Sequence, residues 1–198
     1  FDHAVLEEMA MYASVPVINA LSDREHPCQA LADLLTIREA LGTLAGKRLA
    51  FIGDGNNVCH SLLLAAASVG LHITVVTPDG RGPSPDIVEK ARGRASAAGG
   101  GVRVANEPGA VRGHDVVYTD TWVSMGQGAS DARAFEPFRV DEQLMSVAGD
   151  GLESDPIFMH CLPASRGIEV SGGVIDGPMS VVYDQAENRM HAQNALVL

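Results

Sequence analysis

The chain has 198 residues, which is long enough for one well-packed hydrophobic core and part of a second. Hydrophobic residues make up 46% of it and charged residues 20%, the composition of an ordinary globular protein. The formal net charge of −11 argues against a surface that binds nucleic acid or an anionic membrane, although a few local basic residues can still bind a small anionic substrate.

The cysteines and the apolar runs exclude further classes. Cys28, Cys59 and Cys161 lie far apart and show no spacing typical of a zinc site or a disulfide framework, which favours a reducing, cytoplasmic setting without a metal. The longest apolar run, Leu62–Leu71, is far shorter than the roughly 20 residues that a membrane span needs.

The first part of the chain reads as two helices with a strand between them. Phe1–Ala13 has a helical pattern without an N-cap, and Val15–Leu21 is predicted to be a strand. A helix is expected from about Pro27 to Leu41, with Leu31 in its buried stripe and Gly42 at its end.

From Lys47 onward, strands and helices alternate, which predicts an α/β fold with a Rossmann-like doubly wound parallel sheet and helices on both faces. The expected strands are Arg48–Gly53, His72–Thr77, Val102–Ala105, Asp115–Tyr118, one beginning at Ile157, and Ser180–Tyr183. The expected helices are Asn57–Val69, Ser84–Ala98, Arg139–Val147 and Asp184–Leu198, and Ser124–Asp131 is expected to be a mobile loop.

The segment Ile157–Pro163 combines a buried strand with reactive side chains at the strand's end. Open parallel sheets bind ligands at the carboxyl ends of their strands, so His160 and Cys161 fall where an active site is expected. Neighbouring strand residues point to opposite faces, which argues against a nucleophilic dyad of these two. A lone cysteine at a strand end also fits a simple core position.

Polar residues follow two other strands. Gly53–Val58 resembles a dinucleotide-binding glycine motif but lacks the third glycine, so a tight strand-to-helix turn is favoured, with Asn57 as a candidate amide donor to a carboxylate. Asp120 either pairs with a substrate ammonium or caps its own loop. Ser124–Gly126 either closes over a substrate or is an ordinary turn.

Two remaining candidates lie on predicted helices. His26 and Gln29 stand three residues apart at a helix start, where two donors suit a polarised carbonyl oxygen, although both also fit helix capping. Arg189 lies near the start of the last helix and either binds a carbonyl or phosphate oxygen or is a surface arginine.

Taken together and in this order, the motifs are specific. HPCQALADLLT (26–36), FIGDGNNV (51–58), DTWVSMGQ (120–127), FMHCLPA (158–164) and DQAENRMH (184–191) closely resemble the ornithine carbamoyltransferases. That family transfers a carbamoyl group from carbamoyl phosphate to the δ-amine of L-ornithine, giving L-citrulline and phosphate. The resemblance implies these two substrates and no cofactor or metal.

The resemblance also implies a role for each matching residue. His26 and Gln29 would contact the carbamoyl group, with Arg189 on the carbamoyl phosphate side. Cys161 and the Leu162 backbone would lie at the δ-amine and the carbamoyl nitrogen. The α-amino and α-carboxylate groups of ornithine would be held by Asn57, Asp120, Ser124 and Met125.

The family's phosphate-binding Ser-Thr-Arg-Thr motif and a further arginine have no counterpart in these residues. By the resemblance, 1–42 would be a remnant of the carbamoyl phosphate domain with the linking helix, 43–180 the ornithine-binding domain, and 181–198 a segment returning toward the first domain. We therefore expect a fragment that turns over little alone, and a homotrimer in the complete enzyme.

Two alternatives remain. Putrescine or N-acetylornithine transferases share parts of the pattern, although Asp120 with the Ser-Met-Gly loop favours an amino acid with a free α-ammonium. A non-catalytic module that binds ornithine or a dinucleotide is the alternative from another class.

Overall fold

The computed structural model describes residues 2–122 and 129–198, with residues 129–132 described by their backbone alone. A five-stranded sheet with the order β3-β2-β1-β4-β5 forms its centre, and every strand pair is parallel. The strands are β1 (Arg48–Ile52), β2 (His72–Val76), β3 (Gly101–Ala105), β4 (Val116–Thr119) and β5 (Ile157–His160). This order confirms the doubly wound parallel sheet. After β1 the chain adds β2 and β3 on one side, and it then returns to add β4 and β5 on the other side of β1.

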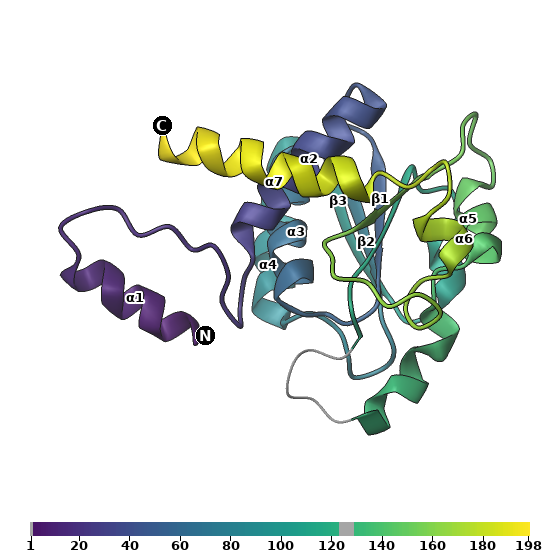
Figure 1. Ribbon diagram of the computed structural model, residues 1–198, viewed down its shortest axis with the longest axis horizontal. Coiled ribbons are helices and arrows are strands. Elements are labelled where there is room, and N and C mark those ends of the chain that lie inside the picture. Colours follow the sequence, from purple (N-terminus) through teal and green to yellow (C-terminus); the bar gives the residue numbers. More distant parts are fainter. Residues whose placement is uncertain (1, 123–128) are drawn as a thin grey trace.

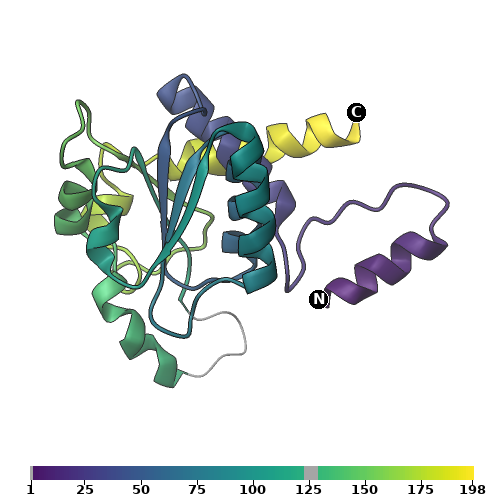
Figure 2. The same cartoon turned by 180° about the vertical axis from the view of Figure 1, so that it is seen from behind.

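Helices cover both faces of the sheet (Figure 1; Figure 2). Strand residues alternate between two cores, so Leu49 and Phe51 pack on one side while Ala50 and Ile52 pack on the other. The first core is covered by α2 (Pro27–Leu41), α3 (Asn57–Ser68) and α4 (Pro85–Ala98), and α7 (Val182–Val197) lies along α2. The second is covered by α5 (Glu142–Gly149), α6 (Gly172–Ile175) and the 3-10 helices η1 (Pro108–Val111) and η2 (Ala129–Phe138).

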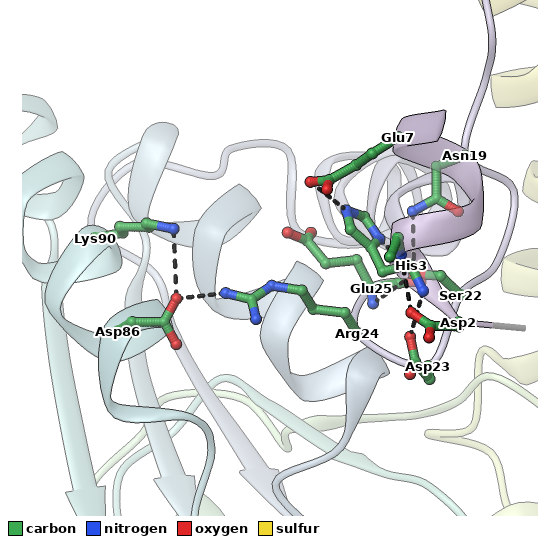
Figure 3. Close-up of polar contacts among 11 residues, drawn as sticks. Asp2, His3, Glu7, Asn19, Ser22, Asp23, Arg24, Glu25, Asp86 and Lys90 are labelled. Carbon is green, nitrogen blue, oxygen red and sulfur yellow. Dashed lines mark hydrogen bonds and ion pairs between the residues drawn. The ribbon is translucent and has the colours of Figure 1, made fainter. Parts of the chain in front are cut away.

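The first helix, α1 (His3–Tyr12), stands away from the body and buries none of its residues (Figure 1). Contrary to expectation it has an N-cap, because the Asp2 side chain accepts a hydrogen bond from the Ala4 amide over 2.9 Å. Its attachment is polar: the His3 backbone donates to Asp23 over 2.9 Å, and the His3 ring lies 2.9 Å from the Ser22 hydroxyl (Figure 3).

The turn that carries these contacts is itself tied to α4. Arg24 forms an ion pair with Asp86, which Lys90 also approaches to 3.4 Å (Figure 3). The side chains of both pairs are about half exposed, so these ion pairs add little to stability.

Two predicted strands are wrong. Val15–Leu21 forms no strand because no neighbour offers it a hydrogen-bonding ladder; the apolar side chain of Val15 is 70% exposed. Ser180–Tyr183 contributes a single bridge, between Ser180 and Phe158, and the chain then enters α7 at Val182.

The buried face of α2 also differs from the prediction. Leu31 is 44% exposed, and the inward face is instead small and polar, with Ala32, Asp33 and Thr36 fully or almost fully buried. This face suits close packing against α7, whose Asn188 amide donates to the Thr36 hydroxyl over 3.0 Å.

Smaller differences concern element ends. Helix α5 begins at Glu142 because Asp141 caps it, its side chain accepting from the Leu144 amide over 2.9 Å. The expected Gly42 terminus of α2 is confirmed, with a left-handed φ of 75°. The short elements η1, η2 and α6 were not predicted. Across the described residues, no helix combines the length and apolar character that a membrane crossing needs.

Candidate active site

The strands β1, β4 and β5 end side by side at one edge of the sheet. The register pairs Ile52 with Thr119 and Thr119 with His160. Asp120 and Cys161 directly follow two of these strands, so the fold brings them together at the edge where open parallel sheets bind ligands.

Cys161 and Asp120 are in direct contact. The Cys161 thiol donates a hydrogen bond to Oδ1 of Asp120 over 3.0 Å. Burial, and next the charge of Asp120, raise the pKa of the thiol well above its usual range. Cys161 is therefore a neutral thiol that donates a hydrogen bond, and it is unsuited to act as a thiolate nucleophile.

Asp120 is held from two further sides. Its Oδ1 accepts from the Thr121 amide over 2.7 Å, and its Oδ2 accepts from the Asn56 side chain over 2.7 Å. Asn57, the predicted amide donor, instead donates to the Ser22 carbonyl over 2.7 Å. Asn56 was not singled out in the sequence, where the two adjacent asparagines are indistinguishable.

The glycine motif after β1 forms a closed turn. A Cβ atom at Gly55 would lie 2.3 Å from the Gly82 carbonyl carbon, so another loop packs directly on this glycine. The α3 amides of Val58 and Cys59 are already bonded to the Asn56 side chain. Both observations favour the strand-to-helix turn over a pyrophosphate site, which needs an open glycine and free amides.

His26, Gln29 and Arg189 form a second group of side chains. An Nη1 atom of Arg189 donates to Oε1 of Gln29 over 2.5 Å and lies 3.5 Å from Nε2 of His26. The His26 backbone amide donates to the Ser61 hydroxyl over 2.8 Å, which ties the start of α2 to α3. The structure thus joins residues that are 160 or more positions apart in the chain.

The predicted pair of donors needs correction. The Gln29 amide nitrogen donates to Oδ1 of Asp33 over 2.8 Å, so Gln29 presents its oxygen, an acceptor, to the site. Burial, and next the charge of Arg189, lower the pKa of His26, so the ring is neutral at pH 7. The charge of Asp120 acts on the pKa of His26 in the opposite direction.

Leu162 follows with an unusual backbone. Its φ of 58° lies in the left-handed region, which a bulky residue seldom adopts, and its amide donates to Nδ1 of His160 over 2.9 Å. Because Nδ1 accepts, the His160 proton is on Nε2, which faces Oε1 of the buried Glu169 at 3.5 Å. The two side chains therefore have different partners: His160 Nδ1 accepts from the Leu162 amide, and the Cys161 thiol donates to Asp120.

One group of side chains in the described residues has metal-ligand spacing. The nearest ligand atoms of Asp120, His160 and Cys161 lie within 4.8 Å of one another. A metal would require the Cys161 thiolate, which burial and Asp120 disfavour, and Nδ1 of His160 is already bonded to Leu162. The arrangement fits a hydrogen-bonded polar site better than a metal centre.

Besides Asn56, the structure adds two residues that the sequence did not single out. Asp33 and Gln185 are buried behind the site and share a hydrogen bond of 2.7 Å. A signal for Asp33 exists, since it lies one helical turn after Gln29 and so shares its face. Of the predicted residues, Ser124 and Met125 lie outside the described residues.

Comparison with known proteins matches two family models. The model of the aspartate/ornithine carbamoyltransferase Asp/Orn binding domain matches residues 45–198. The model of the carbamoyl-P binding domain of the same proteins matches residues 1–39.

Individual relatives agree. An ornithine carbamoyltransferase from Acidothermus cellulolyticus is 52% identical over 201 residues, covering 100% of this chain and 63% of the relative. One from Methanobrevibacter smithii is 52% identical over 200 residues, covering 99% and 65% respectively.

Solved structures show the same likeness. The ornithine carbamoyltransferase from Pyrococcus furiosus superimposes with a TM-score of 0.95 at 48% identity, covering 100% of this chain and 63% of that one. The chain thus spans about 63% of the length of such relatives. With the binding-domain model matching most of its length, the chain belongs to the aspartate/ornithine carbamoyltransferase family.

Proposed function

We propose that this protein takes part in the transfer of a carbamoyl group from carbamoyl phosphate to the δ-amine of L-ornithine, giving L-citrulline and phosphate. The observation that carries the proposal is that hydrogen bonds through Asp33 and Gln185 connect two groups of side chains: the Cys161–Asp120 pair and the group of His26, Gln29 and Arg189. The first suits an amine and the second suits a polarised carbonyl. The names of the relatives at 52% identity support ornithine as the amine.

In this proposal the ornithine side is the edge formed by Asp120 and Cys161. Asp120 pairs with the α-ammonium group. The α-carboxylate is held by Asn57, Ser124 and Met125. The δ-amine must be neutral to attack. Burial, the largest cause of the raised pKa of the Cys161 thiol, disfavours an ammonium group beside it and so favours the reactive amine; the charge of Asp120, which would favour an ammonium group, is paired with the α-ammonium instead.

The carbamoyl side is formed by α2 and α7. As the amine attacks, negative charge develops on the carbonyl oxygen, where Arg189 and His26 donate hydrogen bonds. The Gln29 oxygen and the Leu162 carbonyl accept from the carbamoyl nitrogen, which orients the carbon toward the amine. The tetrahedral intermediate then expels phosphate as the C–O bond breaks, and the departing phosphate takes the proton that the attacking nitrogen loses. These steps need no cofactor.

We further propose the domain roles that the resemblance implies, with 1–42 contributing to the carbamoyl phosphate side, 43–180 binding ornithine and 181–198 returning toward the first domain. The complete enzyme would be a cytoplasmic homotrimer. Because the 198 residues span about 63% of the length of their relatives, we propose that they alone bind carbamoyl phosphate weakly and turn over little.

The first test is ligand binding by the chain, followed by product formation. L-Ornithine, N-acetylornithine and putrescine are titrated by calorimetry, and each is then incubated with carbamoyl phosphate and assayed for its carbamoylated product. We expect ornithine to bind at least tenfold more tightly than the other two. Asp120→Asn should abolish this preference, while Asp155→Asn, an exposed aspartate, should keep it. Preferred binding of putrescine or N-acetylornithine would transfer the assignment to that amine.

A further inference from the structure

A carboxyl group is fully buried behind the proposed site. Oδ1 of Asp33, in the middle of α2, accepts from Nε2 of Gln29 over 2.8 Å and from Nε2 of Gln185 over 2.7 Å. The mechanism above gives Asp33 no contact with substrate. Burying a carboxyl group costs free energy unless it is hydrogen-bonded, so the two partners of Asp33 indicate what the group does.

Each partner reaches a different half of the site. Gln29 turns its oxygen to Nη1 of Arg189 at 2.5 Å, on the carbamoyl side. Gln185 turns its oxygen to the backbone amide of His160, at 2.9 Å, directly before Cys161. The carboxyl group of Asp33 is thus the common point of two hydrogen-bonded chains, one from α2 and one from α7.

The chemistry of amides explains why a carboxylate is needed there. A glutamine amide can rotate by half a turn and exchange its oxygen and nitrogen. A carboxylate only accepts, so it holds both NH₂ groups toward itself and both oxygens outward. If either amide were reversed, an NH₂ group would face the Arg189 cation or the donating His160 amide.

Resting on the proposed function, we propose that Asp33 is a positioning residue that fixes the two glutamine amides and thereby couples the Arg189 group to the Cys161 strand end. It acts through Gln29 and Gln185 and does not touch the reacting atoms. Tyr118 on β4 completes its surroundings, since Gln185 Nε2 also lies 3.2 Å from the Tyr118 hydroxyl.

The ionisation of Asp33 offers a way to test this positioning role. Burial raises the pKa of this carboxyl to about 7, against the hydrogen bonds from Gln29, Gln185 and Tyr118 and the charge of Arg189. Cys161, after β5, and Tyr118, on β4, are two further titratable groups whose pKa is raised by burial and also by the charge of Asp33. Because both glutamine amides donate to this carboxyl group, a change in its protonation near neutral pH should affect both amides together.

The experiment follows the side-chain amide signals of Gln29 and Gln185 by NMR in the 15N-labelled 20.8 kDa chain, assigned by their loss in Gln29→Leu and Gln185→Leu. We expect both to shift with one common midpoint near pH 7, and neither to do so in the isosteric Asp33→Asn. Thr36→Val, one turn further along α2, removes a neighbouring buried contact with α7 and should leave the common midpoint unchanged. Different midpoints in the wild type, or an unchanged titration in Asp33→Asn, would overturn the proposal.

A kinetic arm separates positioning from mere stability. Wherever citrulline formation is detected, Asp33→Leu should lower kcat at least tenfold with KM for ornithine within threefold, while Thr36→Val stays within twofold on both. In a Gln185→Leu background, Asp33→Leu should lower kcat by a smaller factor, because both substitutions break the same series of hydrogen bonds. If the wild-type chain binds none of the three amines, the proposed function fails, while the amide titration still decides the role of Asp33.

Discussion

The Cys161 thiol donates a hydrogen bond to Oδ1 of Asp120 over 3.0 Å, although 41 positions separate the two residues in the chain. The contact exists because β4 and β5 are neighbours in register, so that both residues leave the sheet at the same level. It also helps to keep the sulfur protonated, because burial and next the charge of Asp120 raise the pKa of this partly exposed thiol.

Neutralising Asp120 should make Cys161 more reactive. In Asp120→Asn the thiol loses the neighbouring charge that raises its pKa, so its thiolate fraction increases. We expect alkylation of Cys161 by iodoacetamide at pH 8, followed by peptide mass spectrometry, to accelerate at least fivefold. Asp155→Asn should leave the rate unchanged. An equal rate in Asp120→Asn would show that the carboxylate does not control the thiol.

Arg189 should be indispensable for transfer in the active protein. It contacts Gln29 and approaches His26, where it would stabilise the developing oxyanion. Removing one such donor costs roughly 10²–10³ in kcat in other enzymes, and Arg189→Gln should lose about that much. The exposed Arg92 on α4 provides the control, Arg92→Gln, with unchanged kinetics. A loss below tenfold in Arg189→Gln would exclude Arg189 from this role.

The titration of His26 offers a check that does not depend on turnover. Burial and next the Arg189 charge lower the pKa of this histidine. Removing the charge in Arg189→Gln should therefore raise the pKa, which proton NMR of the His26 ring can follow. Arg92→Gln should not move it. A lower or unchanged pKa in Arg189→Gln would mean that the guanidinium does not act on the imidazole.

The sequence predicted the parts of this site that follow local rules. Alternating strands and helices placed Asp120 and Cys161 at strand ends, and the sheet order brought them together. It could not reveal which asparagine would reach Asp120, because the rotation of α3 relative to β4 decides between Asn56 and Asn57. Asp33 was missed for a similar reason: its burial follows from α7 packing across α2, a contact between distant segments.

Local preference also failed where the tertiary context supplied no partner. Val15–Leu21 has the composition of a strand, yet a strand requires a neighbouring strand for its hydrogen bonds. None of the five strands of the sheet pairs with this segment. At Ser180 the chain makes one bridge to Phe158 and then begins a helix, so the apolar residues there serve packing on α2 and the sheet.

The stability of the chain should depend on pH through Asp33. The folded pKa of about 7 lies above the usual carboxyl value of 3.8, so the folded state binds more protons between these values. The associated stability is fully present below about pH 4 and is lost as the pH rises through 7, with a total on the order of a few kcal/mol. Urea unfolding of Asp33→Asn should lack this slope between pH 5 and 8.

Thr36→Val serves as the control for that measurement. It should be destabilised by about 1 kcal/mol at every pH, because it removes the hydroxyl that accepts from Asn188 but leaves Asp33 in place. Equal slopes in Asp33→Asn and the wild type would show that another group titrates.

Helix α1 should contribute little to the stability of the body. None of its residues is buried, and its contacts with Ser22 and Asp23 are polar and partly or fully exposed. Deleting residues 2–13 should therefore change the free energy of unfolding by no more than about 0.5 kcal/mol, or Tm by about 2 °C. Ile37→Ala, which leaves a cavity where α2 meets the core, should instead cost about 2–5 kcal/mol. A deletion that destabilises the chain as much as Ile37→Ala would mean that α1 packs against the body in solution. The comparison is read from thermal and urea unfolding monitored by circular dichroism.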